Sequence, residues 1–242
     1  SVSLGSGSLQ TIPVIVRLPE NTPANTEIEI RFIMTSQGNQ SVQDTEIVSL
    51  SAKQDHRWEI NGEYQGNSIR NSTIITAPGD VGEVIFEATN IGNLEDDISL
   101  ETYINIRYSG SDNSQGWNAS GTSEEGVEVN QTGNPSVSWS VPNDAWNGTI
   151  MEITVNANSR GEIIDTIIFS IEVPHIKQWR AISSQVDLEI DPEGSSIDIE
   201  ILQLGNSPSN AFSTVYVNGS NDWIVETPEN LPILSPGESA FM

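Results

Sequence analysis

The sequence of 242 residues contains no cysteine and only two histidines. Because zinc fingers, disulfide scaffolds and thiol enzymes depend on cysteine, these classes are excluded. Basic side chains are also scarce, since 9 Lys and Arg stand against 34 Asp and Glu, for a formal net charge of −25. Nucleic acids and anionic membrane surfaces attract basic proteins, so neither is an expected partner. No apolar run approaches the roughly 18 residues that span a bilayer, so we expect no direct membrane insertion in this segment.

The hydrophobic residues that are present alternate with polar ones in short runs. Residues 27–32, 151–156 and 196–201 each place Ile, Val, Phe or Met at every second position. A period of two buries one face of a β-strand and leaves the other in water. Turn sequences such as Asn61-Gly62 and Pro78-Gly79 separate the runs at short intervals. The pattern predicts an all-β antiparallel sandwich or barrel with no helix.

The chain also resembles itself. Residues 16–21 correspond to 139–144, and Trp58 corresponds to Trp179, which lies 121 residues further on. Residues 78–93, which end in Asn90-Ile91-Gly92-Asn93, correspond to 191–206, which end in Gln203-Leu204-Gly205-Asn206. Similarity at a long fixed period indicates a tandem array. The copy that contains residues 78–93 carries an insertion of about seven residues near 106–111.

Four turn motifs in the middle copy resemble a known group of domains. They are Pro78-Gly79, Asn90-Ile91-Gly92, Gly116-Trp117 and Val141-Pro142. In this order they resemble the Ig-like domains that accompany NPCBM modules in α-galactosidases, and the related CARDB adhesion-type domains. The last copy departs from the pattern, with Gln203 in place of the asparagine and Asp222 in place of the glycine before Trp223. The resemblance implies Ig-like sandwiches that act as stalk, spacer or adhesion modules, with no catalytic residues.

The repeat and the resemblance together predict three parts. Residues 1–54 are expected to be the C-terminal part of an Ig-like repeat, 55–174 a complete Ig-like β-sandwich, and 175–242 the N-terminal part of a further repeat. The plain interpretation is a segment of a longer polypeptide, whose partners are neighbouring repeats of the same chain. The alternative is that the two partial repeats complete one another between molecules by strand complementation, which would make a filament subunit.

Acidic clusters raise the possibility of calcium as a cofactor. Glu95, Asp96 and Asp97 follow the Asn-x-Gly turn, and Asp112 lies in the insertion. Calcium needs six to eight oxygen ligands, and the last copy lacks the 95–97 cluster, so solvated surface charge is the preferred interpretation. We expect no other cofactor.

The tryptophans suggest a different ligand, a carbohydrate. Four tryptophans recur at corresponding positions of the repeat, and a fifth, Trp139, lies on an alternating strand. All five are expected in hydrophobic cores or at the contacts between domains. The four that recur are Trp58, Trp117, Trp179 and Trp223. Trp146 has Pro23 as its counterpart and precedes a turn, so it is the ligand-contact candidate. A glycan or protein partner would bind through loops 106–116 and 145–148.

Two small basic clusters lie where one repeat meets the next. His56 and His175, with nearby Lys and Arg, are expected to be junction residues rather than a metal-binding or pH-sensing pair. The adjacent basic residues are Lys53, Arg57, Lys177 and Arg180.

Glycosylation is permitted but not demanded by the sequence. Six Asn-x-Ser/Thr sequons are present, barely more than chance provides in a chain this rich in Asn, Ser and Thr. They begin at Asn39, Asn71, Asn118, Asn130, Asn147 and Asn218.

No combination of residues indicates catalysis. The sequence contains no Gly-rich phosphate loop, nucleophile elbow or metal-binding histidine pair, and its acidic residues mostly occupy the solvent positions of strands. We therefore expect no enzyme, but a non-catalytic extracellular or cell-surface repeat segment that serves as stalk, spacer or adhesion module.

Overall fold

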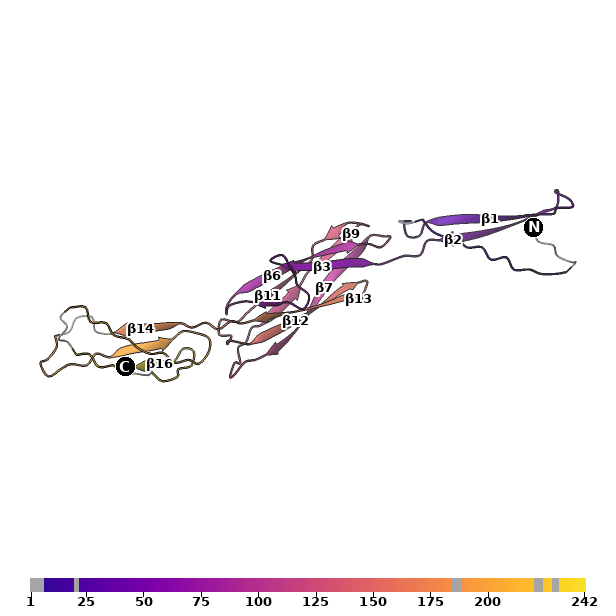
Figure 1. Ribbon diagram of the computed structural model, residues 1–242. Coiled ribbons are helices and arrows are strands. Elements are labelled where there is room, and N and C mark those ends of the chain that lie inside the picture. The colour runs from indigo at the N-terminus through magenta and orange to yellow at the C-terminus, as the bar shows by residue number, and fades with distance from the viewer. Residues whose placement is uncertain (1–6, 20–21, 184–188, 220–223, 228–230) are drawn as a thin grey trace.

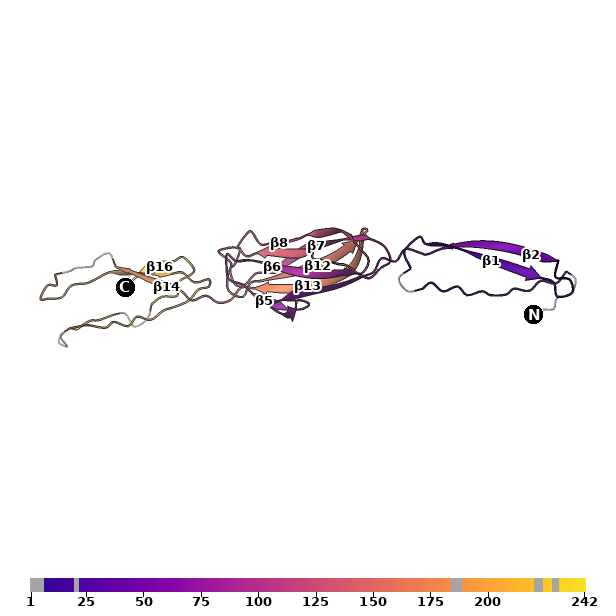
Figure 2. The same ribbon diagram turned by 90° about the horizontal axis from the view of Figure 1, so that it is seen from above.

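The computed structural model describes residues 7–19, 22–183, 189–219, 224–227 and 231–242. This part of the chain contains strands and no helix, and hence no helix that could cross a membrane. The predicted all-β fold is confirmed. Three groups of strands follow one another along one long axis, with the two ends of the chain in the outer groups (Figures 1 and 2).

The middle group is a sandwich of two sheets, which we call the middle sandwich. The first sheet has the order β4-β3-β6-β11-β8, with β10 also paired to β6, and the second has the order β5-β13-β12-β7-β9. The strands of the first sheet are β3 (Trp58–Tyr64), β4 (Asn67–Ser68), β6 (Val81–Asn90), β8 (Asn118–Gly121), β10 (Thr132–Gly133) and β11 (Ser136–Ser140). Those of the second are β5 (Thr73–Ile75), β7 (Asp96–Arg107), β9 (Ser123–Val127), β12 (Ile150–Ser159) and β13 (Glu162–Glu172).

One hydrophobic core lies between these sheets. It draws residues from Ile60 to Val173, and its largest fully buried side chains include Phe86 and Phe169. The alternation read from the sequence is visible in β12, where every second residue from Met151 to Ser159 is buried. The periodic pattern therefore separates the core face from the solvent face, as a half-buried strand requires.

Three details of the middle sandwich differ from the expected antiparallel pattern or from the expected loops. β5 pairs with β13 in parallel, with Thr73 opposite Ser170. β8 belongs to one sheet and β9 to the other, so the chain changes sheets between Gly121 and Ser123. The predicted 106–116 loop is too long, because β7 pairs with β12 as far as Arg107.

The first group is a hairpin of β1 (Glu27–Thr35) and β2 (Gln43–Ser51), which we call the N-terminal hairpin. It repeats β12 and β13 in register, because Ile30 lies opposite Val48 as Ile153 lies opposite Phe169.

The last group, the C-terminal unit, contains β14 (Trp179–Ser183), β15 (Ile199–Gln203) and β16 (Ser239–Phe241). Trp179 pairs with Gln203 as Trp58 pairs with Asn90, so this group repeats the β3–β6 pair. Trp223 lies outside the described residues.

Candidate functional site at the junctions between repeats

The polar side chain of Asn93 joins the N-terminal hairpin to the middle sandwich. Asn93 follows β6, and its Oδ1 accepts the N–H of Asp55 at 2.8 Å. Its Nδ2 donates to the carbonyl oxygen of Lys53 at 3.0 Å and to that of Thr22 at 3.3 Å. One amide side chain thus binds the linker between the two groups and also the turn that leads into β1.

The backbone of Asn93 adds two further bonds across this junction. Its N–H donates to the carbonyl oxygen of Asp55 at 3.1 Å, and its own carbonyl oxygen accepts the N–H of Ala24 at 2.9 Å. A backbone amide and an asparagine side chain are both strong hydrogen-bonding groups, so together they fix the path of the linker.

Asn206 makes the same contacts at the junction between the middle sandwich and the C-terminal unit. Its Oδ1 accepts the N–H of Ile176 at 2.8 Å, and its Nδ2 donates to the carbonyl oxygen of Pro174 at 2.8 Å. Its N–H donates to the Ile176 carbonyl at 3.2 Å, and its carbonyl accepts the N–H of Asn147 at 3.0 Å. The chain therefore builds one junction twice, from residues that correspond through the repeat. We call this arrangement the asparagine clip.

The glycine before each clip asparagine allows the linker to approach. A Cβ added to Gly92 would collide with the carbonyl oxygen of Asp55, and one added to Gly205 would collide with that of Ile176. Because the obstacle is backbone in both cases, no side-chain movement could relieve it. In each copy of the Gly-Asn pair, the glycine thus allows the linker to approach closely, and the asparagine makes the hydrogen bonds to it.

The residue two places before each glycine holds the turn itself. Asn90 accepts the N–H of Gly92 through Oδ1 at 2.9 Å and donates to the carbonyl oxygens of Leu94 and Val127. Gln203 likewise accepts the N–H of Gly205 and donates to the carbonyl oxygen of Ser207. The change from Asn to Gln in the last copy therefore preserves the hydrogen-bonding pattern of the turn.

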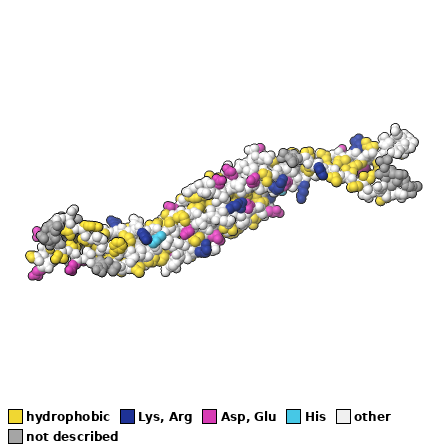
Figure 3. All heavy atoms as spheres, in the orientation of Figure 1, with side chains coloured by type: hydrophobic (Ala, Val, Ile, Leu, Met, Phe, Trp, Pro, Cys, Tyr) yellow, Lys and Arg dark blue, Asp and Glu magenta, His cyan; other side chains and the backbone are white. Residues whose placement is uncertain are grey.

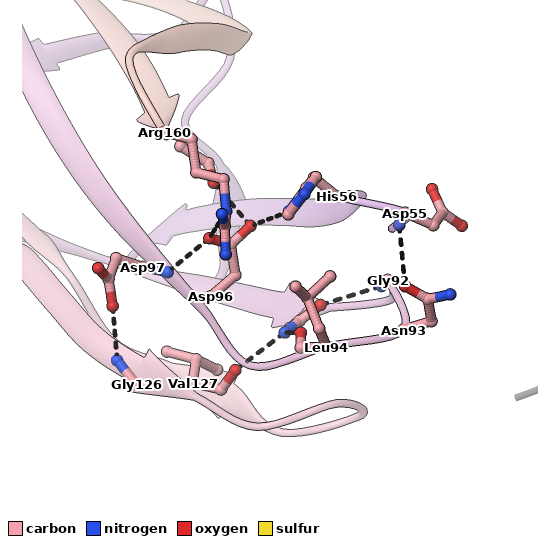
Figure 4. A network of polar contacts seen from close by, with 12 residues as sticks. Asp55, His56, Gly92, Asn93, Leu94, Asp96, Asp97, Gly126, Val127 and Arg160 are labelled. Atoms are coloured by element: carbon pink, nitrogen blue, oxygen red, sulfur yellow. Dashed lines mark hydrogen bonds and ion pairs between the residues drawn. The ribbon is translucent and has the colours of Figure 1, made fainter. Parts of the chain in front are cut away.

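Asp96 supports the first junction from within the middle sandwich (Figure 4). Its buried carboxylate lies 2.9 Å from Nδ1 of the linker residue His56, and it accepts bonds from Ser159 at 2.9 Å and Arg160 at 3.0 Å. Burial alone would raise the pKa of Asp96, but these bonds and the N–H of Asp97 together hold that pKa below its usual value.

Asp112 supports the second junction in a similar way. Its carboxylate accepts the hydroxyl of Thr149 at 2.5 Å, the N–H of Ser114 at 2.8 Å and the N–H of Trp146 at 3.1 Å. Burial would raise the pKa of Asp112, but these donors outweigh it and lower the pKa. The insertion is thereby bound to the turn that carries Asn147, the residue that donates to Asn206.

These findings correct the interpretation of the acidic residues. Asp96 and Asp112 are buried and hydrogen-bonded, not solvated surface charge, whereas Glu95 and Asp97 are exposed. The two buried carboxylates lie at opposite ends of β7, a strand of 12 residues or roughly 40 Å, so they cannot share an ion. Within the described ranges no three acidic or histidine side chains are placed to hold a metal ion.

The tryptophans of the described chain lie mainly in the sandwich. Trp117 and Trp139 are buried in the core, and Trp58 packs against it. Trp179 is half-buried. Trp146, the ligand-contact candidate, is half-buried as well, in a turn that contacts the C-terminal unit. The 145–148 loop is thus part of a junction.

The remaining candidates are dispersed. His175 and Arg180 are exposed, and Arg57 forms an exposed ion pair with its neighbour Asp55 at 2.7 Å. Five sequon asparagines are exposed, and Asn147 is half-buried. The exposed ones are Asn39, Asn71, Asn118, Asn130 and Asn218.

Sequence reasoning located the Asn-x-Gly-Asn motif but treated it as a turn. The side chains of the clip asparagines bond to residues far away in the sequence, at least 38 positions for Asn93 and at least 30 for Asn206. Spacing along the chain does not reveal such partners. The usable signal was the recurrence of Gly-Asn in both copies beside linkers of equal length, residues 52–57 and 173–178.

Comparisons with known proteins assign no family. No protein-family model matches the chain, including those of the domains it resembles in sequence, and no curated protein matches it. Among solved structures, PapD-like domain 7 of human CEP192 is 19% identical, covering 50% of this chain and 85% of that one, with a TM-score of 0.32. The chaperone–tip adhesin complex of CFA/I fimbriae and the class 5 fimbrial chaperone CfaA are each 12% identical, covering 76% of this chain and 84% of theirs, with TM-scores of 0.31 and 0.29. At these scores the similarity carries no conclusion about what the chain does.

Proposed function

We propose that the chain is a non-catalytic segment of an extracellular or cell-surface array, in which β-sandwich repeats act as a stalk, spacer or adhesion module. The observation that carries this proposal is the asparagine clip, which occurs at both junctions with the same four kinds of hydrogen bond. In repeat arrays each unit contacts mainly its neighbours, so the contacts between units determine how well the array acts as a spacer.

The linkers support a spacer with defined geometry. Each has six residues between the last strand of one group and the first strand of the next, and each begins with a buried residue, Ala52 or Val173. A six-residue polar linker without partners would behave as a flexible chain. Here the clip asparagine occupies the linker amides and carbonyls instead, and this restricts the angles available between neighbouring units.

The polar groups of the middle sandwich support a structural role over catalysis. A general acid or base works best with a pKa near the operating pH and with access to substrate. Asp96 and Asp112 have lowered pKa values and direct their carboxylates at donors of their own sandwich and its linker. The hydrogen bonds of these carboxylates hold loops and linkers in place.

Removing the clip side chain tests the proposal. We expect Asn93→Ala and Asn206→Ala to widen the distribution of angles between units, which small-angle X-ray scattering at low protein concentration measures as a broader distance distribution. Each variant loses two or three side-chain hydrogen bonds of roughly 0.5–1.5 kcal/mol each. The unfolding midpoint of the middle sandwich, followed by tryptophan fluorescence, should change little because the clip lies outside its core.

Two further variants serve as controls. Asn105→Ala removes an exposed asparagine of β7 and should scatter as the wild type does. Asn93→Asp keeps the acceptor for the Asp55 amide but loses the donor, so it should fall between Asn93→Ala and the wild type. If Asn93→Ala and Asn206→Ala gave the wild-type scattering profile, the clip would not orient the units and the spacer proposal would lose its support.

A further inference from the structure

The loop between β7 and β8, residues 108–117, contains the insertion of the middle copy and is attached to the core of the sandwich. The indole N–H of the core residue Trp117 donates to the hydroxyl of Ser114 at 3.0 Å. The hydroxyl of Tyr108 donates to the carbonyl oxygen of Ser114 at 3.2 Å, and the N–H of Ser114 donates to Asp112 at 2.8 Å. Ser114 and Asp112 are 1% and 8% exposed. A buried polar network whose members are hydrogen-bonded is rigid, so the loop has a fixed shape.

The same loop contacts the turn before β12, which carries Trp146. The N–H of Ser109 donates to the hydroxyl oxygen of Thr149 at 3.0 Å, and that hydroxyl donates in turn to Asp112. Asp112 also accepts the N–H of Trp146. Gly110 lies against the indole ring of Trp146, because an added Cβ would be 3.4 Å from two atoms of that ring. The β7–β8 loop therefore holds the turn by hydrogen bonds and by packing.

This turn makes the contact with the next unit. The N–H of Asn147 donates to the carbonyl oxygen of Asn206 in the C-terminal unit. The N–H of Gly148 donates to the carbonyl oxygen of Val173, the first residue of the linker, at 2.9 Å, and the N–H of Val173 donates to the carbonyl oxygen of Thr149 at 3.1 Å. Figure 3 shows the units meeting end to end, so the angle between them depends on few contacts of this kind.

The two junctions differ in what holds the turn. At the first junction the clip side chain does so itself, because Nδ2 of Asn93 donates to the carbonyl oxygen of Thr22. Thr22 corresponds to Ala145 in the repeat. Among the described residues, Nδ2 of Asn206 donates to Pro174 alone and does not reach Ala145. The second clip thus lacks one bond to the turn, at the place where the β7–β8 loop binds it.

We propose that the β7–β8 loop fixes the orientation of the C-terminal unit by holding the turn that the second clip does not bind with its side chain. This inference rests on the proposed role of the clip in orienting neighbouring units. The insertion is a property of the middle copy, since the last copy is about seven residues shorter between the clip asparagine and the next tryptophan. The stiffness of a junction is therefore set by a loop of the repeat that precedes it. A loop that sequence reasoning assigned to a ligand thereby has a mechanical role.

Distances between pairs of spin labels measure each junction separately, since the chain has no cysteine of its own. One pair, Ser138→Cys and Arg180→Cys, spans the second junction, and the other, Ser49→Cys and Glu87→Cys, spans the first. All four positions are exposed and lie on strands. Electron paramagnetic resonance on the full chain then gives one distance distribution for each junction.

Asp112→Ala is the variant that tests the inference. It removes three hydrogen bonds within the loop and between the loop and the turn, so we expect the second distribution to widen roughly twofold and the first to stay unchanged. The matched control is Asp144→Ala, which removes an exposed carboxylate close to the same turn and should give both wild-type distributions. If Asp112→Ala does not fold, Asp112→Asn keeps the shape of the side chain and should widen the second distribution by a smaller factor.

The outcomes separate this inference from the proposed function. An unchanged second distribution in the Asp112 variant, beside a widened one in Asn206→Ala, would overturn the role of the loop and leave the clip proposal intact. Wider distributions at both junctions in the Asp112 variant would overturn it too, because they would indicate a general loosening of the middle sandwich. Unchanged distributions in Asn206→Ala and Asn93→Ala would contradict the clip proposal itself, and with it the inference that rests on it.

Discussion

Asp96 and Asp112 are buried aspartates at the two ends of β7, and each holds a loop or linker through several donors. Their pKa values are lower in the folded chain than in the unfolded chain. A carboxyl group of this kind contributes stability above its unfolded pKa, near 3.8, and loses that contribution as the pH falls through its folded pKa. The middle sandwich should therefore weaken in acid at these two residues.

The double variant Asp96→Asn/Asp112→Asn tests this prediction. At pH 7 we expect each substitution to lower the free energy of unfolding by about 1–3 kcal/mol, because charge-assisted bonds are lost inside the sandwich. Below about pH 4 the difference from the wild type should shrink. Urea titrations across pH 2.5–7 measure both effects, with exposed Asp144→Asn as the control. A constant difference across that range would contradict the pKa directions.

Single residues also show where sequence reasoning reaches its limit. Trp58 and Trp179 were matched by the repeat, and each begins the first strand of its group. Asp96 stood in an exposed-looking acidic run, and nothing in that run revealed that Ser159 and Arg160, more than 60 positions away, would cover it. His56 and His175 were expected to be junction residues. His56 does contact Asp96 at the first junction, His175 is exposed, and neutral asparagines make most of the hydrogen bonds across both junctions.

Among the strand elements, the crossing from β8 to β9 brings two backbone segments into close contact. Gly121 ends β8 where the chain changes sheets, and a Cβ there would collide with the carbonyl oxygen of Leu100. That obstacle is the backbone of β7, whose N–H at Leu100 also binds the carbonyl of Thr122 at 2.9 Å. At this point the two sheets are joined by close backbone packing and by that backbone hydrogen bond.

Gly121→Val should consequently destabilise the middle sandwich by roughly 2–4 kcal/mol, as overpacking against rigid backbone does. Chemical denaturation followed by tryptophan fluorescence measures the loss. The control is Gly66→Asn in the β3–β4 turn, where the positive φ of 78° suits asparagine and no atom lies near a new Cβ. Similar losses in both variants would show that the crossing is no tighter than an ordinary turn.

Element types were predictable because alternation is a local signal, while pairings were not. The period of two identified β1 and β12 directly from the positions of Ile, Val, Phe and Met. The parallel contact of β5 with β13 joins Thr73 to Ser170. A strand of three residues is too short for its sequence pattern to predict a pairing partner so far away along the chain.

For the whole molecule, the net charge of −25 is spread over an elongated shape. Repulsion among these charges opposes the compact state. It reaches over about 30 Å at 0.01 M salt but over only about 3 Å at 1 M. We expect the melting temperature to rise by several degrees across that range. NaCl and KCl should act alike, and CaCl₂ should add nothing beyond MgCl₂ of equal ionic strength unless the chain binds calcium. A flat melting temperature would contradict the expectation.

The path of the chain through the middle sandwich has a mechanical consequence. The chain enters at one end of the sandwich through β3 and leaves at the other end through β13 (Figures 1 and 2). A pulling force along the long axis therefore runs parallel to these two strands and perpendicular to their ladder hydrogen bonds. Tension would load all the bonds of β3 with β6, and of β13 with β12, in shear at the same moment instead of opening them one by one like a zip.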